Sequence, residues 1–182
     1  MNYEMTIAGL KRQLPLCKIN DELYIGAFIM FGDVEITVAA AEGLLKKAPE
    51  FDVILTAEAK GIPLAYEMAR QSGKDYVIAR KGSKLYMQDV ISTEVNSITT
   101  DYNQKLFLGK TEADLMKGRR VLIVDDVIST GESLRSMETL VHVVGGNIVA
   151  EMAVLAEGEA ADRDDILFLE KLPLFNKDGS VK

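Results

Sequence analysis

The sequence predicts an α/β domain in which a central, mostly parallel sheet is flanked by helices. Short, nearly continuous apolar runs occur at 51–57, 75–80 and 121–126. Segments with helical character follow the first and the third of these runs. Strands that are buried on both faces and joined by helices are typical of βαβ units in a parallel sheet.

The first predicted unit begins at FDVILTA (51–57), a short apolar run that contains β-branched residues. The tetrapeptide EAKG follows it, and then IPLAYEMARQSG, which is predicted to be a helix. Pro63 suits the first turn of this helix, where an N–H is not needed, and Gly73 suits its end. DYVIAR (75–80) is the next strand candidate.

The second unit begins at VLIVDD (121–126) and continues into a helix predicted from about Glu132 to Val144. Apolar residues recur on one face of that helix, at Leu134, Met137, Val141 and Val144. Gly145-Gly146 ends it, and NIVAEMAVLAEG (147–158) is predicted to be a further strand. Ligands of such sheets bind beyond the carboxyl ends of the strands. The loops EAKG, ARKGSK and DDVISTGES should therefore open on one edge of the sheet.

A long segment of weak periodicity separates the second strand from the third. KLYMQDVISTEVNSITTDYNQKLFLGK (84–110) is interpreted as a long hairpin or mobile loop over the strand ends, and loops of this length are usually functional. Residues of about 1–50 and 158–182 are expected to form a smaller hood subregion beside the site. At 182 residues the chain suits a single domain, 1–182, with a full core.

The net charge, the apolar runs and the counts of cysteine and histidine exclude several classes of function. The net charge of −7 disfavours non-specific binding to nucleic acid or acidic membranes, so no nucleic-acid partner is expected. No run approaches the roughly 18 apolar residues of a membrane span, and no signal-peptide pattern occurs, so a cytoplasmic protein is expected. One cysteine and one histidine exclude an intramolecular disulfide, a C-x-x-C metal site and histidine-rich metal sites.

The stretch VLIVDDVISTGES (121–133) carries the chemistry. Asp125 and Asp126 place two anions where a diol, or a metal-bound diol, can bind. The backbone N–H groups of about Ser129–Ser133 then line a turn at a helix N-terminus, and Gly131 allows that turn. Such a turn favours a phosphate, because the helix dipole and the free N–H groups attract anions. A ribose 5-phosphate carries both features a few ångströms apart.

This stretch resembles the phosphoribosyl-pyrophosphate (PRPP) signature of the type I phosphoribosyltransferases. That signature has four apolar residues, two acids, two variable residues, a small residue, Thr, Gly, usually a second Gly, and Ser or Thr; Glu132 stands in place of the second glycine. TAEAKGIPLA (56–65) is similar to the pyrophosphate loop of purine enzymes, and YVIARKGSKL (76–85) to a segment of the adenine and xanthine enzymes. The tail 153–175 is similar to adenine phosphoribosyltransferases and to the Gram-positive purine-repressor effector domain. The resemblance implies the type I phosphoribosyltransferase fold.

The resemblance also implies a role for each matching position. Asp125 and Asp126 are expected to hold the ribose 2- and 3-hydroxyls, one of them through Mg2+ or its waters, with Mg2+ held mainly by PRPP and water. The 5-phosphate is expected to lie on Ser129, Thr130, Gly131, Glu132 and Ser133. The pyrophosphate is expected to contact Glu58, Ala59, Lys60, Gly61, Arg80, Lys81 and Lys84. The cations in this set are expected to stabilise the departing pyrophosphate.

The residues for the base and its proton match the family pattern least well. Adenine enzymes tend to carry an aromatic stacking residue, for which Phe28 or Phe31 is the candidate. Many adenine enzymes have Glu-Tyr-Gly near the end of the mobile loop, where this chain has Asp101-Tyr102. Asp89 and Glu94 lie in the loop, and neither is assigned as an acid or base. The whole loop is expected to close as a lid that excludes water.

The implied activity is that of a purine phosphoribosyltransferase, most like the adenine enzymes, which makes a nucleoside monophosphate and pyrophosphate from PRPP and a free base. Xanthine, guanine and hypoxanthine stay open as alternative bases. A PRPP-binding regulator without turnover is the alternative class, because KGIPLAY (60–66) and AEG (156–158) resemble the purine-repressor effector domain. The acidic balance and the lack of a preceding winged-helix segment favour the enzyme. The family resemblance implies a homodimer.

Overall fold

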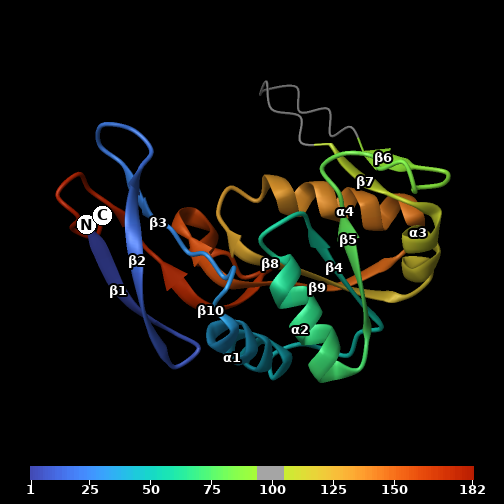
Figure 1. Cartoon of the computed structure of the whole chain (residues 1–182), viewed down its shortest axis with the longest axis horizontal. Helices are drawn as coiled ribbons and strands as arrows, with labels where there is room; N and C mark the ends of the chain where they lie inside the picture. The colour runs from blue at the N-terminus through green and yellow to red at the C-terminus, as the bar shows by residue number, and fades with distance from the viewer. Residues whose placement is uncertain (94–104) are drawn as a thin grey trace.

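A five-stranded sheet in the order β10-β9-β8-β4-β5 forms the centre of the molecule, and all of its neighbouring strands are parallel (Figure 1). The structure is a computed structural model, and it describes residues 1–93 and 105–182. The strands are β4 (Val53–Ala57), β5 (Asp75–Ala79), β8 (Arg120–Ile128), β9 (Asn147–Glu157) and β10 (Leu167–Leu172). The predicted α/β class with a parallel sheet is confirmed.

The strands of this sheet are apolar along their length because both faces are covered. Every residue of β4 is buried. Val53 and Leu55 pack into one core cluster, whereas Ile54 between them packs into the other. Successive side chains of a strand point to opposite faces, so a strand covered on both sides shows a continuous apolar run rather than an alternation.

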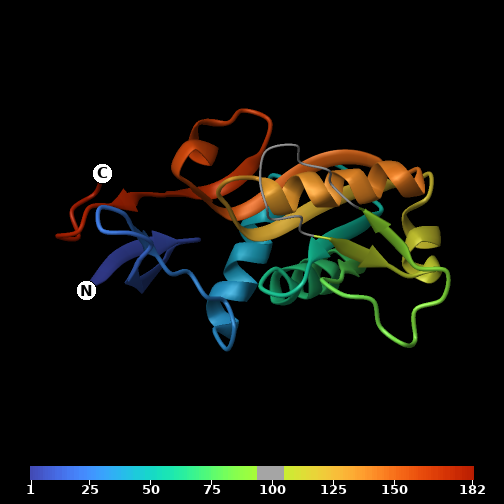
Figure 2. The ribbon, with the colours of Figure 1, turned by 90° about the horizontal axis from the view of Figure 1, so that it is seen from above.

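Two pairs of helices provide that cover (Figures 1 and 2). The helices α1 (Val34–Leu45) and α2 (Ile62–Ser72) lie on one face, and α3 (Lys110–Met116) and α4 (Glu132–Val144) lie on the other. The bounds of α4 are the ones that the apolar periodicity predicts. Glycines in the left-handed conformation stand at both of its caps, Gly131 with φ +77° and Gly145 with φ +78°.

A second sheet, here called the terminal sheet, lies at one end of the molecule and holds both chain ends (Figures 1 and 2). It is antiparallel, with the order β1-β2-β3-β11. Its strands are β1 (Asn2–Ile7), β2 (Leu10–Lys18), β3 (Tyr24–Gly26) and β11 (Leu174–Phe175).

Two elements expected in the hood subregion belong instead to the central layer. Helix α1 packs against α2, and β10, which follows the 3-10 helix η1 (Gly158–Asp162), pairs with β9. In β10, Phe168 packs against one core cluster and Leu169 against the other. Apolar contacts on both faces therefore hold β10 at the edge of the central sheet.

The segment 84–110, which is predicted as a long hairpin or mobile loop, contains two short paired strands. These are β6 (Ile91–Thr93) and β7 (Leu106–Leu108), which are antiparallel, and Leu106 and Leu108 are buried. Arg80 and Phe107 exchange two backbone hydrogen bonds of 2.9 and 2.8 Å, which attach β7 to the end of β5. The residues between the strands, 94–104, with Glu94 and Asp101-Tyr102, lie outside the described residues. No helix within the described ranges is long and apolar enough to cross a membrane.

Two valines on α4 give a matched test of how the sheet is covered. Val141 is fully buried, whereas the side chain of Val143 is 60% exposed. Val141→Ala should lower the free energy of unfolding by about 1–3 kcal/mol, because it removes buried methyl groups and leaves a cavity. Val143→Ala should change it by less than about 0.5 kcal/mol. Urea unfolding of both variants measures the difference, and equal effects would contradict the placement of α4.

Candidate functional site

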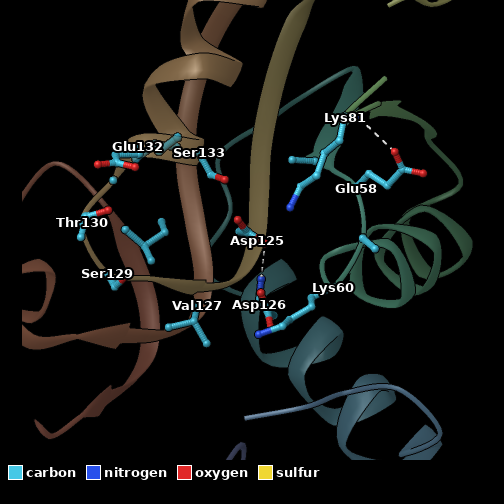
Figure 3. A pocket seen from close by; sticks show the side chains of 15 residues that line it. Glu58, Lys60, Lys81, Asp125, Asp126, Val127, Ser129, Thr130, Glu132 and Ser133 are labelled. Atoms are coloured by element: carbon cyan, nitrogen blue, oxygen red, sulfur yellow. Dashed lines mark hydrogen bonds between the residues drawn. The ribbon is translucent and has the colours of Figure 1, made fainter. Parts of the chain in front are cut away.

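A cavity of about 360 Å³ opens at the carboxyl ends of β4, β5 and β8, as the parallel arrangement predicts. It is lined by 57–60, by Lys81 and by the continuous run 125–134. In Figure 3, Lys60 and Lys81 lie on one side of this space, the turn from Ser129 to Ser133 lies on the other, and the aspartates lie between them. Segments more than sixty residues apart in the sequence thus share one cavity.

Asp125 and Asp126 follow four consecutive buried apolar residues of β8. Asp126 is only 5% exposed, and its Oδ2 has no hydrogen-bond partner within the described part of the chain. Asp125 is partly buried, and its Oδ1 accepts a hydrogen bond of 2.9 Å from the backbone N–H of Asp126. Burial, and then repulsion from Asp126, raises the pKa of Asp125 to about 8, and burial also raises the pKa of Asp126. Within the described residues, Asp126 Oδ2 therefore lacks the donor that a charged carboxylate oxygen needs.

The turn that follows lies at the N-terminus of α4. Gly131 is its N-cap, and Ser129 and Thr130 are exposed at the mouth of the cavity. The N–H groups of the first helical turn have no partners within the helix, and the helix dipole adds positive potential there. Arg135 Nη2 donates a hydrogen bond of 3.0 Å to the carbonyl of Thr130 and so fixes the turn from outside. This geometry suits an anion such as phosphate.

The opposite wall is cationic. The exposed side chains of Lys60 and Lys81 line the cavity, and Lys60 favours the charged forms of Asp125 and Asp126. Glu58 accepts a hydrogen bond of 3.0 Å from the backbone N–H of Lys81, which lowers the pKa of the Glu58 carboxyl. That contact orients the loop after β5.

Three residues predicted for the pyrophosphate do not line the cavity. Arg80 Nη1 forms an ion pair of 3.4 Å with Glu58, so its charge is directed to that carboxylate. Lys84 is exposed outside the cavity. Gly61 is buried beside it, where an added Cβ would clash with Thr56 Oγ1 and lie 3.1 Å from Asp125 Oδ1. Gly61 therefore permits the close approach of two loops.

The two base-stacking candidates differ in their surroundings. Phe28 is 4% exposed and packs within the core, so it has no free ring face in this structure, and this expectation is corrected. An apolar pattern cannot separate a buried ring from a binding platform. Phe31 is 52% exposed and precedes α1, so it keeps a ring face for contact.

Two polar residues near the site escaped the sequence analysis. Thr56 is fully buried in β4, and its Oγ1 has no partner among the described residues. Glu157 is half-buried at the end of β9; burial raises the pKa of Glu157, while the charge of Lys60 lowers it. Both lie at the carboxyl end of an apolar strand, which is the signal that also marks Asp125 and Asp126.

The matching family accounts for the layout of these loops. A model of the phosphoribosyl transferase domain matches residues 34–176 of this chain. The chain belongs to that family. The matched range contains the whole cavity, together with every helix and strand that forms it.

Several members of the phosphoribosyl transferase domain family with curated names are similar to the chain. An adenine phosphoribosyltransferase of Rhodococcus jostii is 32% identical over 80% of this chain and 78% of its own length. One of Chlorobium chlorochromatii is 39% identical over 61% of this chain and 59% of its own length. The purine biosynthesis transcriptional repressor PurR of Bacillus subtilis is 31% identical over 73% of this chain. The chain spans 47% of that repressor.

Solved structures of the family share the fold. The adenine phosphoribosyltransferase of Thermoanaerobacter pseudethanolicus has a TM-score of 0.65 and 26% identity, over 78% of this chain and 84% of its own. The Trypanosoma brucei enzyme, in complex with AMP, pyrophosphate and ribose-5-phosphate, has a TM-score of 0.63 at 18% identity, over 75% and 64% of the two chains. The type I phosphoribosyltransferase fold is confirmed.

Gly61→Ala tests the close approach of the two loops. The added methyl group should lower the free energy of unfolding by about 1–3 kcal/mol, because the side chains of buried Thr56 and of Asp125 leave no room for it. Gly82→Ala is the matched control, since an added Cβ at Gly82 meets nothing within 4 Å. Urea unfolding compares the two variants, and a cost for Gly82→Ala as large as that for Gly61→Ala would contradict the steric argument.

Asp125→Asn tests the burial of the carboxylate pair. Between pH 4 and 8 the unfolded chain has released the Asp125 proton while the ligand-free folded protein still holds it. The free energy of unfolding of the wild type should therefore fall with rising pH in this window, relative to Asp125→Asn. Unfolding in urea at pH 5 and pH 8 measures the change, and a wild type that gains stability over the variant as the pH rises would refute it.

Asp52→Asn provides a comparison of opposite sign. Hydrogen bonds from Arg120, at 2.9 and 3.1 Å, lower the pKa of Asp52. The stability that Asp52 contributes is therefore present above the ordinary carboxyl pKa and is lost as the pH falls. The advantage of the wild type over Asp52→Asn should shrink towards acid pH, whereas its advantage over Asp125→Asn should grow.

Proposed function

We propose that this chain is a purine phosphoribosyltransferase that transfers the 5-phosphoribosyl group of PRPP to adenine, giving AMP and pyrophosphate in purine salvage. One observation carries the proposal: an anion-binding turn, two carboxylates and two lysines surround a single cavity. PRPP has a phosphate, a diol and a pyrophosphate in that order around its ribose. The similarity to adenine enzymes supports adenine as the base.

The turn and the aspartates would bind the phosphoribosyl half. Backbone N–H groups of Ser129–Ser133 would donate to the 5-phosphate, and the start of α4 would stabilise its charge. Asp125 and Asp126 would accept hydrogen bonds from the 2- and 3-hydroxyls of the ribose. Donors bound to a carboxylate favour its charged form, so ligand binding would lower the raised pKa of both groups and release protons.

The cationic wall would bind the leaving group. Lys60 and Lys81 line the cavity and would neutralise charge that grows on pyrophosphate as its bond to the ribose breaks. Lys60 also favours the charged forms of Asp125 and Asp126 in the ligand-free protein, so its charge already acts on this part of the cavity. Backbone N–H groups of Ala59 and Lys60, which line the cavity, would supply further donors to the pyrophosphate.

Mg2+ fits this donor set. Carboxylate oxygens are ligands that Mg2+ prefers, and Asp126 Oδ2 is buried without a partner among the described residues. The described ranges contain no group of three or more acidic, histidine or cysteine side chains that could hold a metal. Asp125 and Asp126 would therefore hold the ion together with PRPP and water. Bound there, Mg2+ supplies charge neutralisation for the pyrophosphate.

The remaining parts of the proposal concern the base, the lid and assembly. Phe31 would stack on the base, and the segment 84–110 would close over the cavity so that the purine nitrogen, and not water, attacks C1 of the ribose. Xanthine, guanine and hypoxanthine are the alternative bases. From the family we also propose a cytoplasmic homodimer that acts without nucleic acid or membrane.

A regulator that binds PRPP without turnover is the second candidate. The observation in its favour is the similarity to the repressor PurR, which extends over 73% of this chain. Asp125, Asp126 and the turn would then sense PRPP, and the cationic wall would have no leaving group to stabilise.

One assay separates these functions. The protein is mixed with PRPP, Mg2+ and one base at a time (adenine, xanthine, guanine or hypoxanthine), and pyrophosphate and nucleotide are measured. Adenine should give AMP and pyrophosphate at the highest kcat/KM. Turnover with another base alone would overturn adenine. No turnover with any base, alongside tight Mg2+-dependent binding of PRPP, would establish the regulator instead.

Two lysines at opposite ends of β5 test the cationic wall. Lys81 follows the strand and lines the cavity, whereas Lys74 precedes the strand at the far edge of the sheet. Lys81→Ala should lower kcat/KM for PRPP by about 100-fold, because it removes a charge that stabilises the transition state. Lys74→Ala should leave it unchanged. Steady-state kinetics in varied PRPP measure both, and equal effects would refute the role of Lys81.

A further inference from the structure

Arg163 lies against the anion-binding turn, although it comes thirty residues later in the sequence. Its Nη1 is 3.1 Å from the position that a Cβ on Gly131 would occupy. Gly131 is buried and has φ +77°, so this guanidinium packs directly on the residue that gives the turn its left-handed bend. Neither the signature motif nor the lining of the cavity includes Arg163.

The guanidinium of Arg163 is held in place from its other side. Its Nε and Nη2 donate hydrogen bonds of 2.8 and 2.7 Å to the two carboxylate oxygens of Asp165, and Nη2 lies 4.0 Å from Glu151. Such a two-pronged pair fixes the plane of an arginine side chain. Because Asp165 occupies Nε and Nη2, Nη1 is left facing Gly131, and within the described ranges it has no acceptor of its own.

The charges around the turn indicate why the contact between Arg163 and Gly131 matters. Glu132, at the first helical position, adds a negative charge next to the site proposed for a phosphate. Lys60 and Lys81 lie on the opposite wall. Two arginines of the described residues contact the turn: Arg135, bonded to the Thr130 carbonyl, and Arg163. Burial, and then a hydrogen bond with Glu138, raises the pKa of Glu151 to about 7 and so reduces the negative charge facing Arg163.

We propose that Arg163 is a positioning residue for the 5-phosphate of PRPP. Fixed by Asp165, it holds Gly131 in its left-handed conformation and thereby keeps the N–H groups of the turn directed at the anion. This inference rests on the proposed function, since it assigns a second layer of support to the same phosphate site. Lysine cannot replace Arg163, because an ammonium group has no planar fork to pair with Asp165 while facing Gly131.

The test uses two ligands, and each of them contains only one end of PRPP. Calorimetry in the presence of Mg2+ measures the binding of ribose 5-phosphate and, separately, of pyrophosphate to the wild type, Arg163→Met and Arg163→Lys. Arg163→Met should weaken ribose 5-phosphate about tenfold and change pyrophosphate by less than about twofold. Arg163→Lys should recover little of that loss. In the enzyme assay KM for PRPP should rise while kcat changes little.

Arg120 provides the matched control. It forms the same two-pronged pair with Asp52, at 2.9 and 3.1 Å, but at the amino end of β8, far along the strand from the site. Arg120→Met should therefore leave ribose 5-phosphate affinity unchanged. Thermal unfolding of each variant confirms that it is folded at the temperature of the assay.

Three results would overturn the role of Arg163. These are unchanged affinity of Arg163→Met for ribose 5-phosphate, an equal loss for pyrophosphate, and an equal loss in Arg120→Met. Full recovery in Arg163→Lys would also overturn it, because charge alone would then suffice. A wild type that binds neither ribose 5-phosphate nor pyrophosphate would overturn the proposed function itself.

Discussion

Asp126 keeps 5% of its surface exposed, and its Oδ2 finds no hydrogen-bond partner within residues 1–93 and 105–182. A buried carboxylate oxygen without a donor costs free energy, and burial together with repulsion from Asp126 also disfavours the charged form of Asp125. The surrounding elements compensate the negative charge of the pair only in part, because Lys60 attracts both carboxylates without forming a close ion pair with either. A ligand that brings a hydroxyl donor or a cation would satisfy the unpaired Asp126 Oδ2.

The parallel sheet makes this arrangement possible. Since β4, β5 and β8 run in one direction, their loops meet at one edge, and each loop brings a different kind of group. The end of β8 brings the carboxylates and the loop after it brings a helix N-terminus, whereas the loops after β4 and β5 bring lysines. Opposite charges thus face each other across a cavity whose walls come from separate parts of the chain, and neither wall could be built by one loop alone.

The features that sequence could predict are those with local signals. Each of three features can be recognised within a few residues of sequence: the apolar run of β8, the glycines at both caps of α4, and the run 125–133. Arg163 has no such signal, because its position against Gly131 depends on how β9 and η1 return the chain to the site. The prediction that Phe28 stacks on the base was wrong for a related reason. An aromatic residue in an apolar segment gives the same sequence pattern whether its ring is buried in the core or exposed to a ligand. The ion pair between Arg80 and Glu58 could not be predicted either, because tertiary packing brings these two side chains together.

Strand β10 ends at Leu172 and β11 begins at Leu174, so a single residue, Pro173, joins the central sheet to the terminal sheet. Proline fixes its own φ near −65° and leaves little torsional freedom at that junction. A rotation of the terminal sheet must then pull on β10, and through its ladder on β9, which carries Glu157 to the edge of the site. The short connection at Pro173 therefore couples the orientation of the terminal sheet to the position of β10, at the edge of the central sheet.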